Sequence, residues 1–314
     1  MSAAKVMVLG SYVQALCLRV HRLPGVGESL LAEEIHVGPG GKGFNLAVGA
    51  RRLGAEVQAL MAVGEDPAGD MALAFLEAEG IPCRHLLRLS APTAQGVGLI
   101  DPQGENCIVV YPGANALLQA AHIAAALPEI AVARVVCAQF EIPEAPILAA
   151  FLEAQGHGIP TLLNAAPFRP IAPDLLALTD VLVLNAREAE GWLDLPSGSL
   201  TTVEAAISAL ESVRSHQSRR VVVTVGAQGC VARDDGGDIL RLPAYPVTAV
   251  DTVGAGDAFC AGLAVGIAER QLFADSLRLA SACGALACCR QGVLRALPDR
   301  PAVERLLQAG KVRF

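Results

Sequence analysis

A carboxylate stands at the end of a glycine-rich turn near residue 250. The segment 251–259 reads DTVGAGDAF and continues into small and apolar residues that predict a helix. Gly254, Ala255 and Gly256 carry little or no side chain, so a ligand can approach their amides closely. Amides at a helix N-terminus, together with the helix dipole, favour an anion. Asp257 could simply cap the helix. A carboxylate beside an anion site is costly, however, and a general base next to a transferring phosphoryl group would explain its presence.

A second glycine-rich segment lies about two hundred residues upstream, where 40–47 reads GGKGFNLA, followed by Gly54 and Gly64. The stretch 38–43 also fits G-x-G-x-x-G, the dinucleotide-binding fingerprint of oxidoreductases. That fingerprint belongs on the first strand–helix turn, whereas about 37 residues precede it here, and Pro39 lacks the amide that a pyrophosphate needs. A P-loop kinase is excluded because the chain has no G-x-x-x-x-G-K-[S/T].

Together, the two segments resemble the two signatures of the ribokinase-like (PfkB) family of carbohydrate kinases. Further matches follow in order between them: Gly113-Ala114-Asn115, Glu141, Asn164-Ala165-Ala166-Pro167, Asn185-x-x-Glu188 and Thr224-Val225-Gly226. The resemblance thus covers nearly the whole chain. It implies an enzyme that phosphorylates a hydroxyl group of a sugar or sugar-like substrate with ATP and Mg²⁺.

The resemblance also implies roles for individual residues. Asp257 would be the general base, and the amides of Gly254, Ala255 and Gly256 would form an anion hole. The residues implied to contact the acceptor are Gly40, Gly41, Lys42, Asn45 and Glu141. Those implied to line the nucleotide and Mg²⁺ site are Asn185, Glu188, Thr224, Gly226 and Ser281. Asp251 and Gly292 resemble contributors to a monovalent-cation (K⁺) site, although Ala296 stands where ribokinases usually have serine.

The chain departs from the family pattern after its first strand. Ribokinases usually read Gly-Ser-x-Asn-x-Asp there, and that Asp hydrogen-bonds two sugar hydroxyls. This chain has Val13 and Ala15 at the two polar positions, with Gln14 between them as a residue that could compensate by a register shift. A sugar, a deoxy sugar and a nucleoside therefore all stay open as acceptors. A relative that binds nucleotide without catalysis is a further alternative, although Asp257 and the anion-hole residues are all present.

The elements that must position these residues follow an α/β pattern. Strands are expected at 5–9, 57–63, 135–137, 161–163, 181–184 and 221–225, with another strand-like run at 246–250 before the glycine-rich turn. Helices are expected at about 45–53, 67–79, 119–126, 143–155, 186–193, 202–215, 255–268, 274–290 and 300–309. Alternating strands and helices predict one doubly wound, mostly parallel sheet flanked by helices. A hairpin at 229–242 and a small β lid from about 12–38 and 94–111 complete this single-domain prediction.

The overall composition of the chain limits the kinds of binding partner that it is expected to have. Of the 314 residues, 53% are hydrophobic and only 4% are aromatic, and the net charge is −7, which argues against nucleic acid as a partner. The six histidines show no metal-binding spacing, and the longest apolar run, 258–268, is too short for a membrane span. Nine scattered cysteines without a CxxC pair predict free thiols in the cytoplasm. The lid, as a small sheet with exposed edges, predicts a homodimer that pairs two lids.

Overall fold

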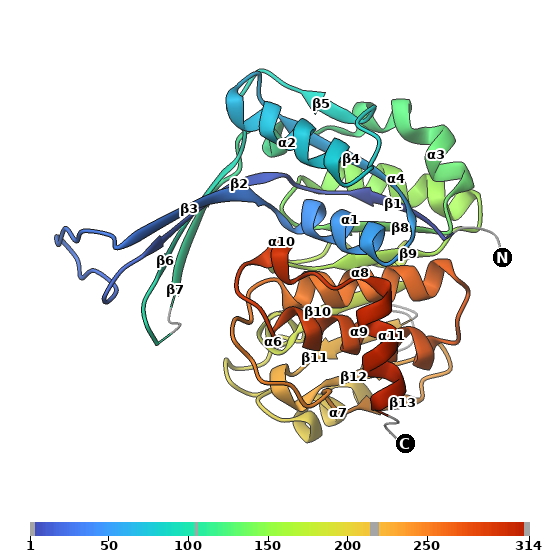
Figure 1. The fold of residues 1–314 in the computed structure, drawn as a ribbon. Helices are drawn as coiled ribbons and strands as arrows, with labels where there is room; N and C mark the ends of the chain where they lie inside the picture. The colour runs from blue at the N-terminus through green and yellow to red at the C-terminus, as the bar shows by residue number, and fades with distance from the viewer. Residues whose placement is uncertain (1–3, 104–105, 214–219, 311–314) are drawn as a thin grey trace.

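The main body is built on a nine-stranded sheet (Figure 1). The structure is a computed structural model that describes residues 4–103, 106–213 and 220–310. The strand order is β13-β12-β11-β10-β9-β8-β1-β4-β5. The bounds are β1 Lys5–Leu9, β4 Glu56–Val63, β5 Leu86–Arg88, β8 Val135–Gln139, β9 Thr161–Asn164, β10 Val181–Asn185, β11 Arg220–Thr224, β12 Cys230–Arg233 and β13 Ile239–Leu242. Pairing is parallel from β5 to β11, and the hairpin β12–β13 adds two antiparallel strands at one edge.

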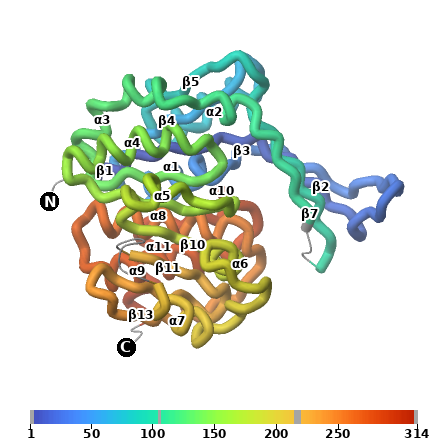
Figure 2. The backbone as a smooth tube through the Cα atoms, turned by 180° about the vertical axis from the view of Figure 1, so that it is seen from behind, coloured from blue at the N-terminus to red at the C-terminus, as the bar shows by residue number. Residues whose placement is uncertain are grey.

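Helices cover both faces of this sheet, because its strands are apolar on both sides. On β1, Val6 and Val8 face one core, whereas Met7 and Leu9 face the other. The first core contains α1 Lys42–Arg52, α2 Pro67–Ala78, α8 Ala255–Ala268, α9 Phe273–Ala287 and α11 Arg300–Ala309. The second contains α3 Leu127–Val132, α4 Glu144–Gly156, α5 Pro173–Ala177, α6 Ala186–Trp192 and α7 Val203–Glu211. The two layers are seen from opposite sides in Figures 1 and 2.

The order of the strands predicts a ligand-binding crevice at the carboxyl ends of β1 and β8. β1 lies between β4, which follows it through α1, and β8, which comes much later in the chain. The winding of the chain therefore reverses between β1 and β8, and in open α/β sheets ligands bind outside the carboxyl ends of the strands at such a reversal. α8 packs against α1 and reaches both β1 and β8, which brings the glycine-rich turn to these strand ends.

A separate four-stranded sheet projects from the body and is called the lid here (Figures 1 and 2). Its order is β3-β2-β6-β7, with β2 Val13–Arg19, β3 Glu34–Gly40, β6 Gln95–Ile100 and β7 Asn106–Tyr111. β2 begins four residues after β1 ends, and β3 runs almost directly into α1. The lid is therefore joined to the body at the same edge where β1 and α1 meet.

Most of the expected architecture is confirmed: the doubly wound, mostly parallel sheet, its flanking helices, the late hairpin and the small second sheet. One expectation is wrong, since residues 246–250 form no strand and belong instead to an irregular connection that leads to the glycine-rich turn. The expected helix 119–126 is largely a 3₁₀ helix, Ala120–Ala126. The helix expected at 202–215 ends at Glu211, and positions 214 and 215 lie outside the described residues. The short elements β5, α5 and α10 (Val293–Ala296) were not expected.

Across the part of the chain that the structure describes, no helix combines the length and the apolar character that a bilayer crossing requires.

Candidate active site

Asp257 lies in the first turn of α8 and is buried. Its Oδ2 accepts a hydrogen bond of 2.7 Å from Nδ2 of Asn45, which lies in the first turn of α1. The two residues are 212 positions apart in sequence, and the packing of α1 on α8 brings them together. The hydrogen bond fixes the orientation of the carboxylate. Oδ1 of Asn45 is buried and has no protein partner among the described residues, so an acceptor atom is left facing this site.

Glu141 lies just past the end of β8, close enough to Asp257 for its charge to raise the pKa of that carboxyl. Its Oε2 accepts a 2.8 Å hydrogen bond from the amide of Lys42 and another from Oγ of Ser11. Three chain segments, just after β1, at the start of α1 and just after β8, are thus joined by one carboxylate. Gly41 makes this possible, because its φ of 97° suits glycine, and a side chain there would press on the carbonyl of Ser11.

The charged side chains at the carboxyl ends of these strands surround Lys42. Burial lowers the pKa of its ammonium group, but the carboxylates of Asp257, Glu141 and Glu188 outweigh burial and leave that pKa above its ordinary value. Lys42 is therefore a cation held among three acidic groups. The same arrangement brings residues of the expected acceptor site (Lys42 and Glu141) and of the expected nucleotide site (Glu188) within electrostatic range of one another.

The pKa of Asp257 is shifted in the direction that suits a general base. Burial raises its pKa, and the nearby charge of Glu141 adds to that rise, while Lys42 and the Asn45 hydrogen bond act against it; the net shift is upward. A carboxylate with a raised pKa accepts a proton more readily than an exposed one. Glu188 is raised for the same first reason, burial, with Asp257 adding to it.

The glycine-rich turn before α8 is shaped by Gly254. Gly254 is the N-cap residue and adopts φ 83°, a left-handed conformation. A side chain on Gly254 would also overlap the side chain of Val293. The amide of Ala255 donates to the carbonyl of Thr252 at 3.2 Å, which closes the turn. Gly256 has open space where a Cβ would be.

The expected nucleotide residues gather at the carboxyl ends of neighbouring strands. Asn185 ends β10 and is paired in register with Thr224, which ends β11. Asn185 and Glu188 form a reciprocal capping box on α6, with two hydrogen bonds of 2.8 Å. Gly226 follows β11 with φ 53° and opens a short 3₁₀ turn. Ser281 is buried on α9, one turn before Gly284, which packs against the carbonyl of Ala255.

Asp251 and Gly292 are also brought together. Oδ2 of Asp251 accepts from the amide of Gly292 at 3.0 Å, and Oδ1 accepts from the amide of Val253 at 3.0 Å. The amides of Val250 and Asp251 in turn donate to the carbonyl of Cys288. Asp251 therefore ties the glycine-rich turn to the end of α9 and the start of α10, a role that sequence reasoning left open between a cation ligand and a plain flanking residue.

Sequence reasoning missed Gln139 as a residue of this site. Its side chain is buried at the end of β8, and neither amide atom has a hydrogen-bond partner in the described chain. Oε1 lies against the backbone of Gly10, at the end of β1. The only sequence signal was a polar residue ending an apolar strand, two positions before Glu141.

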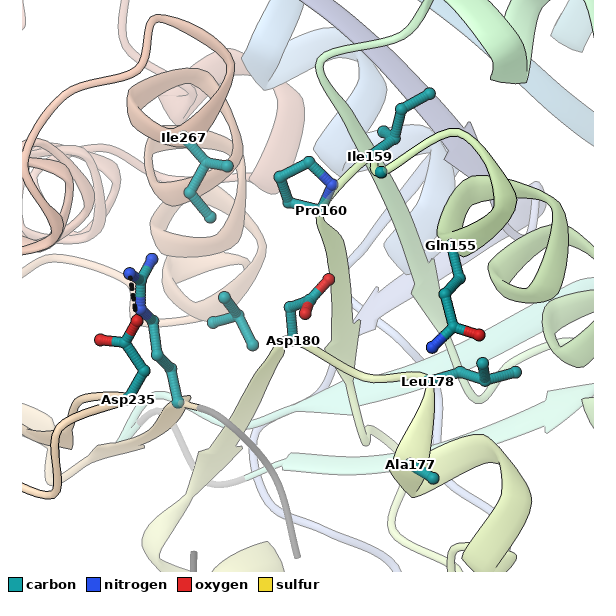
Figure 3. A pocket seen from close by; sticks show the side chains of 11 residues that line it. Gln155, Ile159, Pro160, Ala177, Leu178, Asp180, Asp235 and Ile267 are labelled. Carbon is teal, nitrogen blue, oxygen red and sulfur yellow. Dashed lines mark hydrogen bonds and ion pairs between the residues drawn. The ribbon is translucent and has the colours of Figure 1, made fainter. Parts of the chain in front are cut away.

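A pocket lies at the opposite ends of the strands, away from these residues (Figure 3). It has a volume of about 310 Å³ and lies at the amino ends of β9, β10 and β11. Arg220 and Asp235, which line it, form an ion pair of 3.3 Å. Ligands of doubly wound sheets bind at the carboxyl ends of the strands. We therefore assign the active site to the strand ends near Asp257 and not to this pocket.

Comparison with known proteins agrees with the fold. The model of the "pfkB family carbohydrate kinase" matches residues 3–300. A ribokinase of Bacillus subtilis is 33% identical over 302 residues, which cover 96% of this chain and 99% of that protein. A deoxyribokinase of Salmonella typhi is 31% identical over 259 residues, 81% of this chain and 82% of that protein. The structure of Arabidopsis thaliana ribokinase complexed with ribose and ATP aligns with a TM-score of 0.86 at 26% identity, covering 98% of this chain and 99% of that one.

The fold and the site define a carbohydrate kinase. The chain belongs to the pfkB family of carbohydrate kinases, enzymes that phosphorylate a hydroxyl group of a sugar.

Proposed function

We propose that this kinase transfers the γ-phosphoryl group of ATP to a hydroxyl of a sugar, with Asp257 as the general base. The observation that carries the assignment is the buried carboxylate at the N-terminus of α8, hydrogen-bonded to Asn45 and with its pKa raised by burial. A sugar hydroxyl is a poor nucleophile at neutral pH, so a positioned base that takes its proton accelerates attack. Asn45 keeps the carboxylate oriented while the second oxygen, Oδ1, faces the acceptor.

The acceptor is proposed to lie between Asp257 and Glu141. Lys42 compensates the charges of both carboxylates, and Glu141 is held by Ser11 and by the amide of Lys42. In this arrangement the glycines at 40 and 41 let the acceptor approach the backbone where the lid joins α1. Asn45, Lys42 and Glu141 provide hydrogen-bonding groups for the acceptor hydroxyls.

The triphosphate is proposed to run from the glycine-rich turn toward α6 and the end of β11. The amides of Gly254, Ala255 and Gly256 lie at the N-terminus of α8, where developing negative charge is stabilised. The amide of Ala255 would exchange its 3.2 Å hydrogen bond to Thr252 for one to the phosphate. Asn185, Glu188, Thr224, Gly226 and Ser281 would line the rest of the nucleotide site. These residues come from adjacent strand ends and from α9, which packs on α8.

The residues present fit a Mg²⁺ ion that arrives with the nucleotide. Among the described residues no cluster of three His, Cys, Asp or Glu side chains could hold a metal by itself. Mg²⁺ keeps much of its hydration and binds through phosphates and one or two carboxylates, and Glu188 is the carboxylate on the nucleotide side of Lys42. When bound, Mg²⁺ would neutralise charge on the phosphate oxygens. Glu188 and Asn185 would orient its waters.

A monovalent cation fits beside the turn that Asp251 organises. A carboxylate oxygen that accepts one amide hydrogen bond retains a second lone pair for an ion, and Gly292 lies against it. We propose that K⁺ stimulates the enzyme through this site. Equal rates in K⁺, Na⁺ and a bulky organic cation would remove this part of the proposal and leave the kinase assignment in place.

The lid is proposed to pair with the lid of a second copy. Several large apolar residues of the lid strands are exposed, among them Ile35 at 63%, Val109 at 68% and Tyr111 at 54% exposure. Such a face and its open strand edges are stabilised by pairing in a closed dimer. Light scattering at micromolar concentration tests this proposal, since a monomer alone would contradict it. The cytoplasm stays the proposed location.

The assay for the proposed function is release of ADP from ATP and Mg²⁺ in the presence of pentoses, hexoses, their deoxy forms and nucleosides. We expect release to depend on an acceptor sugar and to be lost in Asp257→Asn. A chain that binds ATP but releases ADP with none of these acceptors would instead be a nucleotide-binding relative without catalysis. Release only with nucleosides would assign a nucleoside kinase.

A further inference from the structure

The lid has two faces of different chemistry, defined by the register of its strands. Val13, Ala15 and Cys17 of β2 are paired with Gly40, Gly38 and His36 of β3, and Ala15 and Cys17 are paired with Gly96 and Gly98 of β6. These residues, with Ile108 and Val110 of β7, are called the inner face. The outer face consists of Gln14, Leu16, Leu18, Ile35, Val37, Pro39, Gln95, Val97, Leu99, Cys107, Val109 and Tyr111.

The inner face is the one turned toward the catalytic turn. Burial raises the pKa of the Cys17 thiol, and the carboxylate of Asp251 raises it further, so this side chain lies within electrostatic range of the segment that precedes Gly254. Val13 and the paired Gly40 are buried, and Gly40 stands two residues before Lys42. Gly41 lies against the amide of Val13, so the inner face near Val13 adjoins Lys42 and Glu141, which are proposed to bind the acceptor.

Gln14 cannot supply a polar group to the inner face. It lies on the outer face, where its Oε1 accepts a 2.9 Å hydrogen bond from Nε2 of Gln95. The regular pairing of β2 with both neighbours along its whole length shows no slip in register. Turning Gln14 inward would shift every residue of β2 to the opposite face. The compensation that the sequence left open is thus excluded by the structure.

In the half of the inner face nearest the body, Val13 and Ala15 offer no hydrogen-bonding group, and the polar side chain beside them is His36, whose Nε2 would lie 3.3 Å from a Cβ on Gly38. This half consists of Val13, Ala15 and the glycines at 38, 40 and 96, and Val13 fills the space above Gly96. A sugar hydroxyl turned toward Val13 and Ala15 would lose its water without gaining a partner from either side chain, which is unfavourable. The opposite side of the site carries Lys42, Asn45, Glu141 and Asp257, so the acceptor site is polar on the body side and apolar at Val13 and Ala15 on the lid side.

We propose that the preferred acceptor is a deoxy sugar, which turns a carbon without a hydroxyl group toward Val13 and Ala15. This inference rests on the proposed kinase function and specifies its substrate class. A nucleoside fits less well. The inner-face residues that the structure describes include no Phe, Tyr or Trp on which a base could stack, and Tyr111 is on the outer face.

The test compares kcat/KM for 2-deoxy-D-ribose and D-ribose, with ATP and Mg²⁺, in the wild type and in three variants. We expect the wild type to favour 2-deoxy-D-ribose by about tenfold or more, as one unpaired hydroxyl requires. Ala15→Asp and the double variant Val13→Asn/Ala15→Asp should shift the preference toward D-ribose, because a carboxylate at 15 can accept from two hydroxyls. Gly38 and Gly96 flank position 15. The His36 ring, which lies over Gly38, would turn away or hydrogen-bond the new carboxylate, and the Val13→Asn change in the double variant replaces the side chain that lies over Gly96.

Leu16→Asn is the matched control, since it introduces a polar side chain on the same strand but on the outer face. Its ratio of the two kcat/KM values should equal that of the wild type, even if the absolute rate changes. A wild type that phosphorylates D-ribose as well as or better than 2-deoxy-D-ribose would overturn the inference while leaving the sugar kinase in place. Preferential phosphorylation of nucleosides would overturn it as well. If the wild type releases ADP with none of the sugars, the proposed function fails and so does this inference. The comparison of the two sugars in the wild type tests the inference even if a variant does not fold.

Discussion

Replacing Asp257 with Asn separates the role of a catalytic base from that of a helix cap. The substitution preserves the size of the side chain, and the amide oxygen can still accept the 2.7 Å hydrogen bond from Asn45. What it removes is the group that takes the acceptor's proton. General base catalysis contributes roughly 10²–10⁴ in rate, and we expect kcat to fall by that factor.

The effect on stability should have the opposite sign. Because burial raises the pKa of Asp257, its charged form is less favourable in the folded protein than in the unfolded chain. The contribution to stability is full at low pH and is lost as pH rises through the raised pKa. Asn carries no charge at any pH, so the melting temperature of Asp257→Asn should equal or exceed that of the wild type at neutral pH, with the difference shrinking in acid.

Steady-state ADP release and thermal melting of the same preparations make the measurement. Affinity for ATP should change little, since the phosphates are held mainly by amides that the variant keeps. Asp194→Asn, at an exposed residue with φ 54°, is the matched control and should leave kcat unchanged. A fall in kcat of less than about tenfold for Asp257→Asn, on a sugar that the wild type turns over, would refute its role as base. A lower melting temperature with unchanged kcat would identify a structural cap.

Three further predictions follow from the same geometry. On the acid side of the pH–rate profile, the midpoint of the fall in kcat/KM should lie above the ordinary Asp pKa of about 3.9, because the raised pKa keeps Asp257 protonated, and so inactive, to higher pH. A midpoint at or below that value would contradict this prediction. Glu188→Gln should raise the Mg²⁺ concentration needed for half-maximal rate while the fold is retained, as a Mg²⁺ titration and a melting curve would show; an unchanged titration would argue against a role for Glu188 at the ion. Gly43→Ala should abolish folding or lower the melting temperature strongly, because the added Cβ would overlap the backbone of Gly10, whereas Gly156→Ala, with open space around it, should not.

The sequence alone was sufficient for the family and the layered α/β fold, and it proposed most of the residues that the structure brings together in the candidate site. Strand and helix periods are local properties, and a buried parallel sheet requires the continuous apolar runs that 135–137 and 221–225 display. The glycine-rich turn before Asp257 was equally legible, because the left-handed conformation of Gly254 is one that few other residues adopt. The expected strand at 246–250 failed because an apolar run becomes a strand only where a neighbouring strand can pair with it.

Tertiary structure decided how those residues act on one another. Asn45 and Asp257 are 212 positions apart, and only the packing of α1 on α8 makes them partners. The raised pKa of Asp257 and the position of Lys42 among three carboxylates depend on burial and distance, which no local pattern contains. Gln14 was ambiguous in sequence because neighbouring residues of a strand face opposite sides, and only the register with β6 and the hydrogen bond to Gln95 settles which side it takes.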